Sequence, residues 1–332
     1  MERNIQIESR RRKKDMKKFI PVVVCVSFLL CSCGKEKSEQ IMKMYDVTSQ
    51  QSEFTYIQSS DSGVGTAFAS DLCVVSNDVQ QNGVDITSEV ASIYCLDDKE
   101  VIYAKNVHQK MNPASLTKVM TALLLLEYGN LDTEVTITQE AMISESGATL
   151  CDLKPGDKLT LRQLLNCALV RSGNDAASAI AIAVSGDINS FVDKMNERAK
   201  QLGATNTHFA NPHGLTAENH YTTAYDMYLI LNAAMQYEEF LTISSQGSYE
   251  LNYANASQPR TYDSTNRYLI NKATPPEGVR IIGGKTGTTK AAGSCLALLS
   301  KNPQGKWFCS IILKAESGDI MYEEMNKLLL LE

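Results

Sequence analysis

The sequence lacks the cysteine and histidine spacings that bind metal ions. Its nine cysteines include no Cys-x-x-Cys pair, and none of its four histidines has a histidine partner one helical turn away. The six cysteines after residue 70 are scattered singly along the chain, which is more typical of small buried side chains than of a disulfide framework. We therefore expect no metal and no cofactor.

A hydrophobic run long enough to cross a membrane is missing from the N-terminal region. The candidate segment, residues 19–33, has 15 residues, whereas a spanning helix needs about 20. Eight basic residues precede it within residues 1–18, and a basic segment before a short apolar one is typical of an export signal. We therefore expect an exported protein, with a spanning anchor as the weaker alternative.

The end of this segment, Leu-Cys-Ser-Cys at 30–33, resembles the processing box of bacterial lipoproteins, in which cleavage precedes a cysteine that then carries lipid. Cys33 is the expected lipidation site, because the small Ser32 precedes it and a leucine lies three positions upstream. Ordinary signal cleavage with secretion is the alternative. Residues 1–33 are then the signal peptide, and residues 34–65, rich in Ser, Gln, Glu and Lys, form a flexible tether.

Positive charge is scarce once the signal is removed. After residue 18 the chain carries 24 basic and 35 acidic residues, a formal net charge of −11. Nucleic-acid binding depends on contacts between Lys or Arg and phosphates, so such an acidic chain is a poor candidate for it. The basic cluster belongs to the signal, and we expect no nucleic-acid partner.

Short β-like segments lie near both ends of the region 66–332, with helical patterns between them. Pairing of the two groups of strands predicts one antiparallel sheet, with the helical insert on one face and the terminal helix on the other. The expected strands are 90–96, 100–104, 134–138, 279–282, 285–289, 294–300 and 306–313, and the expected helices are 113–128, 161–169, a helix from 174, 187–202, 223–235 and 319–331.

The chain is organised around the expected helix 113–128, whose residues are apolar almost all the way round. A helix of this composition lies buried inside a fold. Ser115 and Lys118 are three positions apart in its first turn and therefore leave the same face. A hydroxyl group beside an amine can be activated without a histidine, although a polar cap on a core helix would have the same sequence.

Two triplets extend this pair to a set, namely Ser-Gly-Asn at 172–174 and Lys-Thr-Gly at 285–287. Together with Ser-x-x-Lys they are typical of penicillin-binding proteins and class A β-lactamases. Each pattern alone is weak, since Ser-x-x-Lys recurs at 32–35 and Ser-x-Asn recurs at 264–266. We favour the first Ser-x-Asn because it lies at an expected break between two helices, where side chains can point into a cleft.

Five segments that include these motifs resemble the serine-type D-alanyl-D-alanine carboxypeptidases, the low-molecular-mass penicillin-binding proteins. The similarity extends over residues 66–332, which we expect to form the catalytic domain. It implies the penicillin-recognising serine acyltransferase (β-lactamase/transpeptidase-like) fold of the α+β class, a five-stranded antiparallel sheet with helices on both faces and a large helical insert. The segments are 113–121, 172–177, 209–215, 220–226 and 283–289, of which we expect the third and fourth to support the fold.

The resemblance implies that Ser115 attacks the terminal D-Ala–D-Ala bond of a peptidoglycan pentapeptide stem and forms an acyl-enzyme. Lys118 would take the serine proton, which requires a neutral amine. Burial and a second cation, for which Lys285 is the candidate, would both lower the pKa of Lys118. Ser172 would relay a proton to the leaving amine, and the N–H groups of Ser115 and Thr288 would form the oxyanion hole.

The same resemblance implies how substrate is held. Asn174 would bind the peptide amide of the stem, while Thr286 and Thr288 would bind the free carboxylate beside the positive charge of Lys285. Family members often add an arginine to the carboxylate site, and none follows Arg280 here. The implied catalytic residues are Ser115, Lys118 and Ser172, and the implied substrate-binding residues are Asn174, Lys285, Thr286, Gly287 and Thr288.

Two alternatives share these motifs. A serine β-lactamase also needs an acid that drives water onto the acyl-enzyme, usually in a Glu-x-x-Leu-Asn segment, and the sequence has none between 172 and 285. A non-catalytic peptidoglycan-binding protein or β-lactam sensor has no need of a proton relay. We expect a monomeric D,D-carboxypeptidase anchored outside the cytoplasmic membrane, with stem peptides as substrates and β-lactams as inhibitors. The sequence does not specify which third residue of the stem peptide is preferred, or whether the role is in vegetative growth or in sporulation.

Overall fold

The computed structural model describes residues 71–332. The expected signal peptide, the expected lipidation site Cys33 and the expected tether at 34–65 lie outside the described residues. Within residues 71–332, no helix combines the length and the apolar character that crossing a membrane requires.

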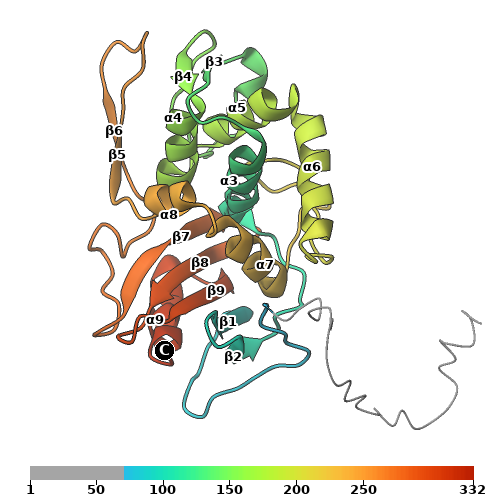
Figure 1. The fold of residues 1–332 in the computed structure, drawn as a ribbon, viewed down its shortest axis with the longest axis vertical. Helices are drawn as coiled ribbons and strands as arrows, with labels where there is room; N and C mark the ends of the chain where they lie inside the picture. The colour runs from blue at the N-terminus through green and yellow to red at the C-terminus, as the bar shows by residue number, and fades with distance from the viewer. Residues whose placement is uncertain (1–70) are drawn as a thin grey trace, which may run out of the picture. The chain divides into compact units, whose positions relative to one another are not determined.

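A five-stranded antiparallel sheet lies at the centre of this region, in the order β2-β1-β9-β8-β7 (Figure 1). β1 (Val90–Cys95) and β2 (Glu100–Lys105) form the N-terminal hairpin, and β9 (Trp307–Ala315) pairs with every residue of β1. β8 (Gly293–Lys301) and β7 (Arg280–Thr289) complete the sheet. The predicted sheet, built from strands at both ends of the domain, is confirmed.

The strand that carries the Lys-Thr-Gly triplet is longer than predicted. The sequence predicts separate strands at 279–282 and 285–289, because a Gly-Gly pair lies between them. The structure has one continuous strand, β7, with a shift of register between Ile281 and Gly283, the first of the two glycines. Gly284 has a φ of 145°, and a Cβ atom there would lie 2.3 Å from the carbonyl oxygen of Ala297. The glycines therefore permit a bulge within the strand instead of ending it.

Different helices cover the two faces of the sheet (Figure 1). Successive side chains of a strand point to opposite faces, so Tyr94 and Ile93 of β1 belong to different cores. Tyr94 stacks on Tyr228 of α7 (Ala224–Ala234), with ring centroids 4.4 Å apart. Ile93 packs in the second core, which includes apolar residues of α9 (Gly318–Leu329). The predicted placement of insert and terminal helix is confirmed.

The insert consists of short helices and two small hairpins (Figure 1). The predicted strand at 134–138 is present as a three-residue strand, whereas a helix at 238–244 and the hairpin that follows it were not predicted. The elements not yet named are α3 (Thr117–Tyr128), β3 (Glu134–Thr136), β4 (Lys158–Thr160), α4 (Leu161–Asn166), α5 (Asn174–Ser185), α6 (Ile188–Gln201), α8 (Glu238–Ser244), β5 (Ser248–Leu251) and β6 (Arg260–Asp263).

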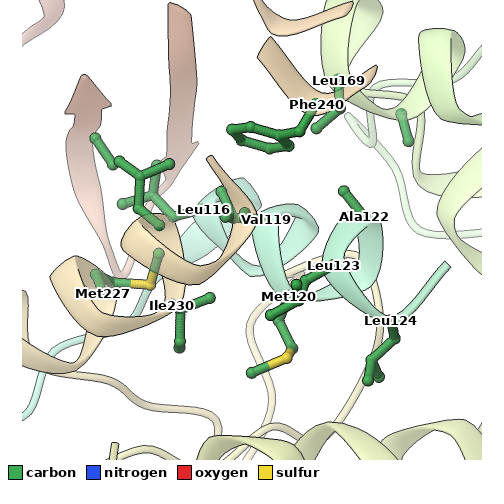
Figure 2. Close-up of a cluster of buried hydrophobic side chains, with 14 of the residues drawn as sticks. Leu116, Val119, Met120, Ala122, Leu123, Leu124, Leu169, Met227, Ile230 and Phe240 are labelled. Atoms are coloured by element: carbon green, nitrogen blue, oxygen red, sulfur yellow. The ribbon is translucent and has the colours of Figure 1, made fainter. Parts of the chain in front are cut away.

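α3 is enclosed on several sides, as its apolar sequence predicts. Val119 and Leu123 are fully buried, and Figure 2 shows them among side chains of other helices, including Met227, Ile230 and Phe240. Interiors of this kind are packed as densely as organic crystals. The core therefore holds the first turn of α3, which directly follows the turn that carries the predicted nucleophile Ser115, in a fixed position.

The chain changes helix type before it reaches the Ser-Gly-Asn triplet. Thr160 and Gln163 form the capping box at the start of α4. The sequence predicts one helix to residue 169, but α4 ends at Asn166 and a π-helical turn, Cys167–Arg171, follows. Ser172 then adopts a left-handed conformation with φ 68° and ψ 32°. Helical turns of this type and left-handed residues other than glycine are concentrated at functional sites.

Candidate active site

Ser115 lies in a 3-10 turn, Ala114–Leu116, that leads directly into α3. Its side chain lines a cavity of about 230 Å³. Lys118, one turn further along, is fully buried, with 0% of its surface exposed. The structure brings the two predicted groups together, since Nζ of Lys118 lies 3.0 Å from Oγ of Ser115.

The amine of Lys118 has three polar neighbours. Nζ lies 2.6 Å from Oδ1 of Asn174 and 2.7 Å from the carbonyl oxygen of His213, in addition to the hydroxyl of Ser115. The two carbonyl oxygens can only accept hydrogen bonds. A neutral amine has two N–H groups, which these two oxygens occupy, so its lone pair faces the Ser115 hydroxyl group. This is the arrangement of a base that is ready to receive the serine proton.

Burial favours the neutral form of Lys118. Desolvation lowers the pKa of Lys118 well below its ordinary value, and the nearby charge of Lys285 lowers it further. Burial also lowers the pKa of Lys285, to about 7. Burial and the charge of Lys285 therefore both favour the neutral amine that a base at position 118 requires. The structure thus contains the second cation that the sequence analysis expects beside the base.

Ser172 and Lys285 form a second serine–lysine pair in the same site. Nζ of Lys285 donates hydrogen bonds to Oγ of Ser172 at 3.0 Å and to the carbonyl oxygen of Thr286 at 2.9 Å. Ser172 is 5% exposed, and it lines the same cavity as Ser115. A hydroxyl group that links a buried amine to the cavity suits the transfer of a proton to a bound ligand.

Neighbouring backbone groups fix the position of Asn174. Its N–H group donates to the carbonyl oxygen of Thr149 at 2.9 Å. The carboxylate of Asp175 accepts hydrogen bonds from the N–H groups of Cys151 and Leu153 at 3.0 and 3.1 Å. These bonds tie the segment around residue 150 to the start of α5. Oδ1 of Asn174 accepts from Lys118, and within residues 71–332 its Nδ2 group has no partner, which leaves it free to donate to a ligand.

Strand β7 passes very close to the nucleophile. A Cβ atom at Gly287 would lie 3.0 Å from the nitrogen of Ser115 and 3.0 Å from the carbonyl oxygen of Pro113. A side chain at this position would therefore push the strand and the serine turn apart. Thr286 and Thr288, on either side of the glycine, both line the cavity, so the Lys-Thr-Gly segment forms one of its walls.

The second Ser-x-Asn match, at 264–266, also lies beside this cavity. Its middle residue, Thr265, lines the cavity, and Oγ1 of Thr286 donates to Oγ1 of Thr265 at 2.6 Å. Ser264 is not among the lining residues, whereas Ser172 is. The serine of the favoured triplet therefore lines the cavity. The other triplet contributes only its middle residue, Thr265, to the cavity wall.

Arg267 is a residue of the cavity wall that the sequence analysis missed. Arg267 precedes Arg280 in the sequence, whereas the sequence analysis looked for a carboxylate-binding arginine only after Arg280. Its guanidinium group pairs with Asp319 and lies 5.3 Å from the ring centroid of Tyr322. No sequence signal could have found it, because the path of the long loop between β6 and β7 decides where this side chain lies.

A second cavity of about 510 Å³ adjoins the first, and Thr288 lines both. Glu145 and Lys290 bring opposite charges to its wall, and neither takes part in any ion pair among the residues that the structure describes. The two cavities together form a site that can receive a ligand longer than a dipeptide.

Lys285→Met should make the fold more stable. Because burial lowers the pKa of Lys285 from 10.5 to about 7, the unfolded chain binds more protons between these pH values, and stability rises with pH in this window. Removal of the amine should raise the free energy of unfolding by about 1–4 kcal/mol at pH 7, and the gain should shrink toward pH 10.5. Urea unfolding at both pH values, with the exposed Lys158→Met as control, measures this. A loss of stability at pH 7 would contradict it.

The fold and the site together define a class of protein. An antiparallel sheet with helices on both faces and a serine–lysine pair at the start of its central helix is the architecture of the penicillin-recognising serine acyltransferases. The model of the D-alanyl-D-alanine carboxypeptidase family, peptidase family S11, matches residues 76–323. The chain belongs to this family.

Relatives with known names support this assignment. D-alanyl-D-alanine carboxypeptidase DacF of Bacillus subtilis is 35% identical over 208 residues, which cover 62% of this chain and 52% of the relative. D-alanyl-D-alanine carboxypeptidase DacC of Escherichia coli is 32% identical over 274 residues, 80% of this chain and 64% of the relative. The chain thus spans between half and two thirds of the length of these relatives.

Solved structures agree on the fold. The DD-transpeptidase of Streptomyces K15 superposes with a TM-score of 0.68 at 28% identity, covering 74% of this chain and 97% of that one. A D-alanyl-D-alanine carboxypeptidase of Mycobacterium tuberculosis superposes with a TM-score of 0.68 at 27% identity, covering 76% and 95%. The predicted fold class is therefore confirmed.

Proposed function

We propose that this protein is a serine D,D-carboxypeptidase that removes the terminal D-alanine from peptidoglycan pentapeptide stems, and that β-lactams acylate the same serine. One observation carries the proposal: Nζ of the buried Lys118 lies 3.0 Å from Oγ of Ser115, which lines the cavity, and its other two polar neighbours are carbonyl oxygens. Membership of the D-alanyl-D-alanine carboxypeptidase family supports the choice of substrate.

In the first half of the reaction, Oγ of Ser115 attacks the carbonyl carbon between the two D-alanines while Lys118 takes its proton. The N–H groups of Ser115 and Thr288 stabilise the resulting oxyanion, a contribution of about 3–4 kcal/mol for one such donor. The C–N bond then breaks, and the proton reaches the leaving amine through Ser172, which is hydrogen-bonded to Lys285. Free D-alanine and an ester on Ser115 are the products of this step.

In the second half, a water molecule attacks the ester carbonyl carbon, and Lys118 accepts its proton. The bond between the acyl carbon and Oγ of Ser115 breaks, and the proton returns to the serine. Lys118 has already been neutralised by delivery of its first proton to D-alanine, so the same amine serves both steps. The tetrapeptide stem leaves with a new carboxylate.

The substrate carboxylate would lie between Thr286, Thr288 and Arg267. These three residues line the same cavity, and Lys285 adds positive charge behind the threonines. Arginine binds carboxylates through two parallel N–H groups. Arg267 therefore supplies the contact for which no arginine was found after Arg280. The rest of the stem would extend past Thr288 into the second cavity.

Arg267→Ala should raise KM for a stem-peptide mimic about 5- to 20-fold and leave kcat nearly unchanged, because the contact is present before and during the reaction. Steady-state release of D-alanine measures both constants. Arg162→Ala is the matched control, since Arg162 also pairs with an aspartate but lies outside the cavity. A fall in kcat at constant KM would contradict this role.

Two measurements on the exported domain test the proposed function. Intact mass after incubation with penicillin should increase by one penicillin per chain, and a stem pentapeptide mimic should release D-alanine. Absence of both products would show the proposal to be wrong. Turnover of penicillin at many cycles per second would instead favour a β-lactamase, and labelling without release of D-alanine would favour a β-lactam sensor.

We propose that the enzyme acts outside the cytoplasmic membrane as a monomer. The basic and apolar N-terminal segment supports export, and Cys33 in its lipoprotein-like box supports anchoring through lipid, with residues 34–65 as the tether. The mass of the processed N-terminus distinguishes a lipid-modified Cys33 from ordinary signal cleavage. Gel filtration of the domain without its anchor tests the monomer.

A further inference from the structure

A chain of three hydrogen bonds runs beneath the nucleophile. The N–H group of Ala210 lies 2.9 Å from Nδ1 of His220, Nε2 of His220 lies 2.8 Å from Oγ1 of Thr117, and Oγ1 of Thr117 lies 2.8 Å from the carbonyl oxygen of Ala114. His220 is 3% exposed, and Thr117 and Ala114 are buried. These hydrogen bonds link the segments that contain Ala210 and His220 to Ala114, the residue that precedes Ser115.

The direction of each of these bonds follows from the chemistry of the groups. A backbone N–H group can only donate, so Nδ1 of His220 is an acceptor and carries no proton. Nε2 of the neutral ring must then carry the proton, which it donates to Oγ1 of Thr117. The hydroxyl hydrogen of Thr117 is left to donate to the carbonyl oxygen of Ala114, which can only accept. Every group in the chain is satisfied in one way only.

This chain controls the peptide bond that joins Ala114 to Ser115. A trans peptide is planar, and its C=O and N–H groups point in opposite directions. A fixed direction for the Ala114 carbonyl group therefore fixes the direction of the Ser115 N–H group. Ala114 also has a φ of 47°, a left-handed conformation that a residue with a Cβ atom keeps only when its surroundings impose it.

The backbone of Gly214 contacts the carbonyl group of Ala114 as well. A Cβ atom at Gly214 would lie 1.9 Å from the oxygen of Ala114, so the backbone of the loop at 214 touches it directly. The oxygen is thus held between the Thr117 hydroxyl group and the backbone of Gly214. Both the loop and His220 belong to segments that the sequence analysis expects only to support the fold.

We propose that Thr117 and His220 are positioning residues that aim the N–H group of Ser115 at the oxyanion of the transition state. This inference rests on the proposed acyl-enzyme function. Neither side chain lines the cavity, and both act through the Ala114–Ser115 peptide bond. Loss of these hydrogen bonds should therefore weaken binding of the transition state more than binding of the substrate.

Thr117→Val removes the hydroxyl group with little change of shape. We expect the rate constant for acylation by penicillin to fall about 10- to 100-fold, since loss of a whole oxyanion donor costs about 10²- to 10³-fold, while the dissociation constant of the initial complex changes less than about threefold. Affinity for a peptide boronic acid, which mimics the tetrahedral intermediate on the serine, should fall by a similar factor as the rate constant. Thr117→Ser, which keeps the hydroxyl group, should restore most of both.

Two variants at His220 distinguish its hydrogen bond to Thr117 from its hydrogen bond to Ala210. His220→Gln places an amide nitrogen near the position of Nε2 and keeps the donor to Thr117, whereas His220→Asn keeps an acceptor for Ala210 and loses that donor. We expect His220→Gln to acylate faster than His220→Asn by about 5-fold or more. If Thr117→Val does not fold, the comparison of the two His220 variants alone tests the proposed positioning role.

Thr160→Ala controls for stability, because it removes the half-buried cap of α4 outside the cavity. It should lower the melting temperature without changing acylation. Acylation of Thr117→Val at the wild-type rate, or equal rates for the two His220 variants, would overturn the inference and leave the proposed function intact. Failure of the wild-type protein itself to be acylated would instead overturn the proposed function.

Discussion

Replacing Lys118 with methionine should lower the rate of Ser115 acylation by penicillin about 10³- to 10⁴-fold, the upper part of the range for loss of a general base. In the described structure the Lys118 amine is hydrogen-bonded to the serine hydroxyl group, and its other two contacts are to carbonyl oxygens. Methionine fills similar space but cannot accept a proton. The serine would then have to lose its proton to water.

Stopped-flow acylation with a chromogenic cephalosporin measures this effect. Lys105→Met is a matched control, because Nζ of Lys105 also donates to two backbone carbonyl oxygens, at 2.7 and 2.8 Å, but lies outside the cavity. The control should acylate at the wild-type rate. If Lys118→Met kept more than about a tenth of the wild-type rate, Lys118 would not be the base.

The dependence of acylation on pH follows from the same residue. A base must be neutral, and a lysine with an ordinary pKa of about 10.4 would lose activity about tenfold for each unit of pH below that value. Burial lowers the pKa of Lys118 well below this value, which moves the loss to lower pH. An ordinary lysine would cost about a hundredfold in rate between pH 9 and pH 7, and the wild-type rate should fall by much less than that.

Ser115→Ala should abolish covalent labelling by penicillin and reduce release of D-alanine about 10⁴-fold or more, since loss of a nucleophile removes the acyl-enzyme pathway altogether. The fold should remain, because the hydroxyl group contributes a single side-chain contact, to Lys118. Intact mass and peptide mapping measure the label, and circular dichroism checks the fold.

Ser264→Ala provides the control for this second prediction. Ser264 belongs to the competing Ser-x-Asn match and is 7% exposed, but it does not line the cavity. Its replacement should leave labelling and turnover unchanged. A label that persists in Ser115→Ala, or disappears in Ser264→Ala, would contradict the assignment of the nucleophile.

Short-range sequence patterns predicted much of this site. The spacing of Ser115 and Lys118 needs only one helical turn to bring them together, and the apolar composition of α3 predicts its burial. The break before the Ser-Gly-Asn triplet was also visible in the sequence. Its details were not, because the π-helical turn and the left-handed Ser172 depend on packing against the rest of the insert.

Contacts that depend on long loops could not be predicted. The carbonyl oxygen of His213 reaches Lys118 across 95 positions, and Thr265 reaches Thr286 across 21. A backbone carbonyl has no sequence signature, and a loop residue such as Arg267 shows nothing of its final neighbours. The Gly-Gly pair at 283–284 misled the prediction for a local reason, since glycine both ends strands and permits bulges within them.

The place of β7 at the end of the sheet has a consequence for selectivity. Its outer edge has no neighbouring strand in the described sheet, so its backbone groups can pair with an extended peptide by β-augmentation. Such pairing recognises the backbone of any extended peptide and does not distinguish one side chain from another. For the stem peptide of the proposed function, discrimination between D- and L-alanine would then depend on the cavity wall beside this edge, which includes Gly287, Ser172 and Thr288. In the proposed function the open edge would supply affinity, and the cavity wall would supply stereochemical selectivity.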